Sequence, residues 1–178
     1  MGNRPFLVTF LLTVLVGYSQ ETYTLSEGSL LTISGTSTVH SWTVTANNIQ
    51  GTMSYADNIK DVRLQVPVAD IKSERGAAMD KKMHGALKME QHPDVSFVFS
   101  EIDNSDGLSI KGKLTIAGVE KSVDLKSEIL AVDKGYSIKG AKEITLQDFG
   151  MEPPTAMFGQ IVVGDKVTVN YNLIFSKQ

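Results

Sequence analysis

The sequence predicts an all-β protein, an antiparallel sandwich or barrel, with one short helical segment. Apolar and polar residues alternate with a period of two along several runs, and Gly-rich turn signals separate those runs. One stretch rich in Ala, Met, Lys and Glu interrupts the pattern. Alternation places one face of each strand against a core and the other in water, and many short strands between turns are typical of sandwiches and barrels.

The composition is that of one globular domain. The chain has 178 residues, of which 42% are apolar and 21% charged, so it can bury a sizeable core. Its 17 basic and 20 acidic residues give a formal charge of −3, without the basic surplus of a nucleic-acid binder. It has no Cys, which excludes disulfides, thiolate zinc sites, Cys nucleophiles and lipid attachment through an N-terminal Cys.

The first 19 residues have the pattern of a secretory signal peptide. Arg4 precedes an uncharged run of 11 residues at positions 6–16, and Gly17 and Ser19 supply the small residues of a cleavage site. A membrane anchor is the alternative, but a span needs about 20 apolar residues. We therefore expect residues 1–19 to be a signal peptide and residues 20–178 to be one domain, periplasmic or secreted.

The strands are expected where alternation is clearest. The runs lie at residues 62–68, 95–99, 108–116, 123–125, 161–163 and 167–175, with weaker versions at 31–33, 42–44 and 49–55. Turn residues between them lie at 47–48, 104–107, 117–118 and 133–135. Gly164-Asp165 separates two alternating runs and predicts a two-residue hairpin.

Residues 73–90 favour helix by composition. Ser73 is a suitable N-cap, and Gly76 and Gly85 divide the stretch into one or two short helices. Pro93 ends it. Residues 150–159 are expected to be a loop, since Pro153-Pro154 cannot continue a ladder or a helix. The apolar stripe of the helix is narrow and contains Met79, Met83, Ala86 and Leu87.

The sequence does not predict an enzyme. His40, His84 and His92 lack the spacing of paired metal ligands, so we expect no metal site. His40 follows Ser37, but no G-x-S-x-G elbow is present, and the favoured interpretation is a strand-end His that bonds its neighbours. A hydrolase that uses His40 remains the less favoured alternative.

A barrel of about eight strands either fills its interior with side chains or holds one small ligand. Periodicity does not distinguish a filled core from a cavity. A cavity lined by the inward Leu, Ile, Val, Phe and Tyr residues would have few polar anchors and would suit a long apolar molecule.

Several motifs, in this order, resemble the YceI-like family, lipocalin-like periplasmic polyisoprenoid-binding proteins. They are residues 35–42 (GTSTVHSW), 66–68 (VPV) leading to 71–73, 92–97 (HPDVSF), 112–119 (GKLTIAGV) and 159–169 (GQIVVGDKVTV). The resemblance covers nearly all of residues 20–178. It implies an eight-stranded antiparallel lipocalin-like barrel with a short inserted helical segment, and neither a catalytic triad nor an obligate metal. His92 and Val95 depart from the family pattern, which has an aromatic residue and a larger aliphatic one there.

The resemblance also implies a function. The barrel would hold an isoprenoid-like lipid, a quinone or polyprenyl chain, as its apolar ligand, with no other cofactor, no nucleic-acid partner and no stable membrane span. The oligomeric state is left open, a homodimer being one option. The alternative is a filled barrel that acts as a stress-response or interaction module. The expected ligand-binding residues are Trp42, Val66, Met83, Phe97, Phe99, Leu108, Ile110, Leu114, Val123, Leu125, Tyr171 and Leu173.

Overall fold

The computed structural model describes residues 21–177. The expected signal peptide lies outside the described residues. The described part of the chain is mostly strand, with one α-helix and two short 3-10 helices. The elements are β1 (Glu21–Leu25), β2 (Leu30–Ser37), β3 (Ser41–Ala46), β4 (Gln50–Tyr55), β5 (Ile59–Pro67), η1 (Val68–Asp70), β6 (Ile71–Ser73), α1 (Ala77–Ala86), β7 (Asp94–Asp103), β8 (Ser109–Ile116), β9 (Val119–Val132), β10 (Gly135–Thr145), η2 (Leu146–Phe149), β11 (Thr155–Ala156) and β12 (Ile161–Ser176).

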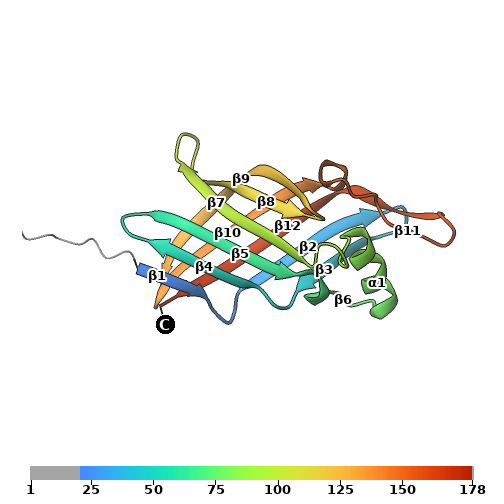
Figure 1. Ribbon diagram of the computed structural model, residues 1–178, viewed down its shortest axis with the longest axis horizontal. Coiled ribbons are helices and arrows are strands. Elements are labelled where there is room, and N and C mark those ends of the chain that lie inside the picture. The colour runs from blue at the N-terminus through green and yellow to red at the C-terminus, as the bar shows by residue number, and fades with distance from the viewer. Residues whose placement is uncertain (1–20, 178) are drawn as a thin grey trace, which may run out of the picture.

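The strands close into an antiparallel barrel (Figure 1). The closed order is β1-β4-β5-β7-β8-β9-β10-β12, and β12 returns to β1 through the pairs Thr24↔Ser176 and Leu25↔Phe175. This confirms the eight-stranded barrel with a single short helix. Closure matters because it removes the exposed sheet edges through which an open sheet aggregates.

Three of the barrel strands continue past a bend or turn into a second numbered element. These pairs of elements are β1 with β2, β4 with β3, and β5 with β6. Both β1 and β2 pair with β12, while β4 pairs with β1 and β3 pairs with β2. In the same way β5 pairs with β4, and β6 pairs with β3. The predicted turn at residues 47–48 is therefore a bend between β3 and β4, where the chain does not reverse direction.

Two turn predictions have opposite outcomes. Ala117 and Gly118 join β8 to β9 with φ values of 49° and 81°, the left-handed pair that a tight hairpin requires. The hairpin at Gly164-Asp165 is wrong, because β12 runs through both residues with a register shift against β2 between Val163 and Val167. The extra residues between these two pairs form a bulge in β12.

The helix is shorter than its composition suggests. α1 has Gly76 as its N-cap, with φ of 86° and no capping side chain, so the prediction of Ser73 as N-cap is wrong. Ser73 still belongs to β6, where its hydroxyl accepts a hydrogen bond from the Arg75 amide. The segment at residues 150–159 is a loop except for the two-residue strand β11.

One end of the barrel is filled. Phe175 and Met53 are buried at the end where β1 meets the last residues of β12, and Tyr55 stacks on Tyr136 with ring centroids 4.1 Å apart. Tyr23 meets the same Tyr136 ring edge-on at 5.4 Å. These side chains pack together inside the barrel. Figure 1 shows that the end where β1 and the C-terminus lie is opposite α1. None of the helices within residues 21–177 has the length and apolarity to span a membrane.

Candidate functional site

An apolar cavity of about 280 Å³ lies inside the barrel. Inward side chains of the barrel strands form its wall, from Leu173 and Ile138 up to the segments beside α1. Several lining residues at the α1 end, including Arg75, Met79 and Lys82, are exposed, so the cavity reaches the surface there. The interior is therefore filled at one end and hollow at the other.

The helix contributes its apolar stripe to this cavity. Met79, Met83, Ala86 and Leu87 all line it, as their spacing of four, three and one residues along one helical face allows. Met side chains are unbranched and flexible, so this part of the wall can change its shape. The stripe predicted from the sequence is confirmed, and it packs over the cavity mouth.

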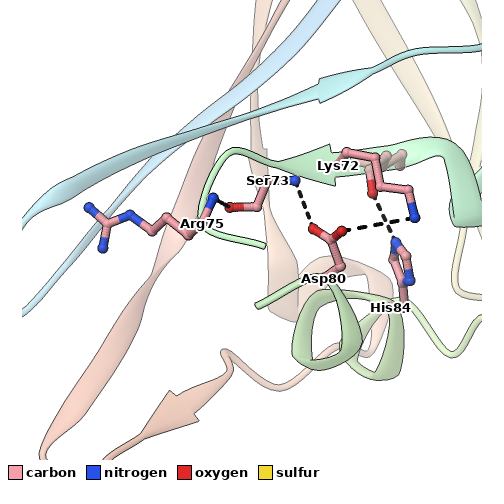
Figure 2. A network of polar contacts seen from close by, with 6 residues as sticks. Lys72, Ser73, Arg75, Asp80 and His84 are labelled. Carbon is pink, nitrogen blue, oxygen red and sulfur yellow. Dashed lines mark hydrogen bonds and ion pairs between the residues drawn. The ribbon is translucent and has the colours of Figure 1, made fainter. Parts of the chain in front are cut away.

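Polar contacts fasten α1 to β6 (Figure 2). Asp80 Oδ1 accepts a hydrogen bond of 2.8 Å from the Ser73 amide, and Asp80 Oδ2 lies 3.9 Å from Lys72 Nζ. One turn later, Nε2 of the buried His84 lies 2.9 Å from the Ile71 carbonyl oxygen and donates to it. These contacts hold the helix in place, whereas the Arg75 side chain points away from them.

Three inward glycines shape the wall, because each lies under an aromatic ring. A Cβ on Gly35 would lie 2.4 Å from the Trp42 ring, and one on Gly112 would lie 2.4 Å from the Phe97 ring. At Gly140 it would lie 2.3 Å from the Tyr171 hydroxyl. The missing side chains let the rings lie against the strands, and all three rings line the cavity.

The pair of Gly35 and Trp42 gives a test of this geometry. We expect Gly35→Ala to displace the Trp42 ring, because the three atoms nearest to the added Cβ, at 2.4 to 2.9 Å, all belong to that ring. Overpacking of this kind costs about 1–3 kcal/mol of unfolding free energy. Trp42 is the only Trp, so its emission spectrum and urea denaturation report on the change directly. Gly85→Ala is the control, since no atom lies within 4 Å there and alanine favours helix. If Gly35→Ala and Gly85→Ala changed the Trp42 emission and the unfolding free energy equally, the close contact between Gly35 and the Trp42 ring would be contradicted.

A chain of hydrogen bonds links Ser37, His40 and Arg75 at the cavity mouth. The Ser37 hydroxyl donates to the His40 carbonyl oxygen at 2.9 Å, so its oxygen accepts from His40 Nδ1 at 2.8 Å. Nε2 is then unprotonated and accepts from the Arg75 guanidinium. The prediction of a strand-end His that bonds its neighbours is confirmed. The ring positions Arg75, and the Ser37 hydroxyl donates its proton to the His40 backbone carbonyl oxygen and not to the ring.

The charged side chains that line the cavity are all basic. They are Arg75, Lys82 and Lys142, and none of the Asp or Glu residues in the part of the chain that the structure describes lines it. Within residues 21–177 none of the three makes an ion pair, although Lys82 Nζ donates to the Thr155 carbonyl oxygen at 2.9 Å. Lys142 faces inward on β10 between Gly140 and Ile144, so the strand places a cation in the wall of an apolar cavity.

A second polar group lies on the inner wall. The Tyr171 hydroxyl lies 2.9 Å from Ser127 Oγ and donates to the Lys126 carbonyl oxygen at 3.4 Å. Burial raises the pKa of the Tyr171 phenol above its ordinary value, so the group stays neutral. The wall thus offers a ligand mostly carbon atoms, with a few polar atoms at separate points.

A family model for the YceI-like domain matches residues 23–175. The chain belongs to the YceI-like family. No curated protein was found to match it. Solved structures share the fold at low identity. Burkholderia cenocepacia BcnA has a TM-score of 0.70 and 17% identity, with 84% of this chain and 96% of that one covered. A polyisoprenoid-binding domain from Saccharophagus degradans has a TM-score of 0.71 and 12% identity, and the match covers 88% of this chain and 98% of that one. The Campylobacter jejuni YceI protein has a TM-score of 0.62 and 17% identity, and the match covers 99% of this chain and 94% of that one.

Most residues expected to bind the ligand of this YceI-like protein lie in the cavity wall. Phe99 and Leu108 do not. Phe99 packs with the cluster that fills the closed end, and half-buried Leu108 lies just before β8, where its carbonyl oxygen accepts from the Ser127 amide. The ten that line the cavity are Trp42, Val66, Met83, Phe97, Ile110, Leu114, Val123, Leu125, Tyr171 and Leu173.

The sequence pattern did not predict the basic groups in the wall of this YceI-like barrel. Lys142 had a usable signal, because Ile138, Lys142 and Ile144 share one parity along a strand. Arg75 had no such signal in the sequence, since its position at the mouth depends on how α1 packs.

Among residues 21–177, no three His, Asp or Glu side chains gather as metal ligands would.

Proposed function

We propose that this YceI-like protein binds an isoprenoid-like lipid, a quinone or polyprenyl chain, in the barrel cavity. The observation that carries the proposal is an apolar cavity that is continuous from the closed end to the mouth beside α1. Each CH₂ group that a ligand buries there contributes about 0.8 kcal/mol, so a long chain binds without polar anchors. The family and the polyisoprenoid-binding neighbour support a lipid-binding barrel.

The ligand would lie with its tail towards Leu173 and its polar end at the mouth. Arg75 and Lys82 offer hydrogen-bond donors there, and the Arg75 guanidinium is oriented by His40. A quinone oxygen or another polar head accepts such bonds. The protein would work as a carrier in the periplasm or outside the cell, which the family relationship supports.

The two alternatives have less support. A filled barrel acting as an interaction module would leave no room for a ligand, whereas this barrel has a cavity of about 280 Å³. A hydrolase using His40 would need Nε2 or Nδ1 free to take a proton from a nucleophile. Both ring nitrogens are engaged, with Ser37 and Arg75. We therefore propose a binding protein and not an enzyme.

Native mass spectrometry of protein purified from its own host tests the proposal. We expect a mass adduct that lipid extraction releases and identifies as an isoprenoid, because an apolar cavity of this length favours occupation. Added geranylgeraniol should form an equivalent adduct with delipidated protein. A ligand-free spectrum from the host, together with no uptake of geranylgeraniol, would count against lipid binding.

A further inference from the structure

Exposed apolar side chains gather around the cavity mouth. Within residues 21–177, the chain exposes nine large apolar side chains, and five of them belong to segments beside the mouth. Phe158 is the extreme case at 110% exposure, and Met157 and Val39 follow at 63% each. Val162 and Met79 complete the set. We call Val39, Met157, Phe158 and Val162 the mouth ledge.

Strand pairing and a backbone hydrogen bond fix the position of the mouth ledge. β11 and the start of β12 form a hairpin with the pairs Thr155↔Val162 and Ala156↔Ile161. Thr38, at the tip between β2 and β3, donates from its amide to the Val162 carbonyl oxygen at 3.0 Å. Both tips project from the barrel at the end that carries α1 (Figure 1). The apolar tips therefore lie on one side of the molecule.

The backbone of the hairpin turn is unusual for an exposed apolar pair. Met157 and Phe158 have φ values of 51° and 55°, in the left-handed region that L-residues other than Asn, Asp and His rarely adopt. The Gly159 amide donates to the Ala156 carbonyl oxygen and the Gln160 amide to the Met157 carbonyl oxygen, and the Thr38 hydroxyl donates to the Gln160 carbonyl oxygen. Phe158 gains no packing within the described chain in return. An apolar side chain held out in this way is explained if something outside the chain covers it.

The surroundings indicate what covers it. Ala156, Ile161 and Val163 follow or flank the ledge and line the cavity, so the ledge continues into the cavity wall. Arg75 and Lys82 are exposed at the same rim. Apolar tips bordered by Lys and Arg are the pattern of surfaces that enter the interface of a bilayer, where cations meet anionic headgroups.

We infer that the mouth ledge docks the protein on a lipid bilayer, with Phe158 and Met157 inserted and the cavity mouth facing the membrane. The inference rests on the proposed function in one respect, because a lipid carrier must take its ligand from a membrane. Docking in this orientation lets a lipid tail pass from the bilayer to the cavity along a continuous apolar path. A protein partner would not explain why the ledge adjoins the open cavity.

Co-flotation with phosphatidylcholine vesicles, with and without phosphatidylglycerol, tests the inference. We expect the full protein to float with the vesicles, more strongly when phosphatidylglycerol is present. The double variant Met157→Ser/Phe158→Ser should lower the vesicle partition coefficient at least about tenfold, since two large side chains no longer enter the interface. The matched control is Leu130→Ser/Val132→Ser on β9, where two exposed apolar side chains lie at the closed end.

The outcomes separate docking from lipid binding. Docking is supported if the control double variant floats as the unchanged protein does and the ledge variant does not, while all three still form the geranylgeraniol adduct. It is overturned if the unchanged protein stays with the aqueous phase, or if both double variants lose flotation equally. It is also overturned if sedimentation shows that the ledge joins two copies of the chain. Flotation without any geranylgeraniol uptake would defeat the proposed function alone.

Discussion

Replacing Phe175 with alanine is expected to lower the free energy of unfolding by about 3–5 kcal/mol. Phe175 is fully buried, at 0% exposure, and packs with Met53 and Tyr23 in the cluster that fills the closed end. It also stands opposite Leu25 where β12 meets β1 and closes the barrel. Alanine leaves a cavity at this junction, so both packing and closure are weakened. Urea denaturation followed by far-UV circular dichroism measures the loss.

Phe158→Ala is the matched control for this prediction. It removes the same atoms from a side chain that is fully exposed, so its effect should stay within about 0.5 kcal/mol. If the two variants lose similar stability, the closed end is not the packed core that the contacts of Phe175 indicate.

Filling the cavity is expected to have the largest effect on ligand uptake. Val169 lies on β12 opposite Lys142 and Ile33, and its side chain lines the hollow part of the barrel. Val169→Trp should place an indole where the ligand chain would lie. Steric overpacking of about 1–3 kcal/mol corresponds to a loss of affinity for geranylgeraniol of about fivefold to 150-fold. A titration by native mass spectrometry measures it.

The neighbouring residue supplies the control. Thr168→Trp adds an indole to the opposite face of the same strand, so it should leave uptake within about twofold of the unchanged protein. Circular dichroism shows whether each variant keeps its fold, and Ile138→Phe serves as a milder filling variant if Val169→Trp unfolds. Unchanged uptake in both filling variants would mean that the ligand binds elsewhere.

The strands were predictable because their signal is local. Inward and outward residues alternate along each one, so residues such as Leu114 and Tyr171 could be assigned to the inner face before any partner strand was known. The stripe of Met79 and Met83 was predictable for the same reason, at helical spacing. The hairpin prediction at Gly164-Asp165 failed because β12 pairs with β2 on both sides of these residues, through Val163 and Val167, so tertiary pairing overrode a local turn signal.

The candidate site was predictable only in part. Phe99 and Leu108 have the right parity and composition for a cavity wall, yet they lie towards the filled end. Arg75 and His40 are 35 residues apart and meet only because α1 follows β6 beside the tip of β2 and β3. No spacing in the sequence encodes that contact.

By itself the sequence determined a single all-β chain whose strands each present one apolar face, since side-chain direction in a strand depends only on position along it. The tertiary structure decided that these faces enclose a barrel that is filled by Tyr, Met and Phe side chains at one end and hollow at the other. That difference arises from side-chain volumes brought together across strands far apart in the sequence. The three inward glycines add to it, because the room that each leaves under its aromatic ring exists only after the strands have paired.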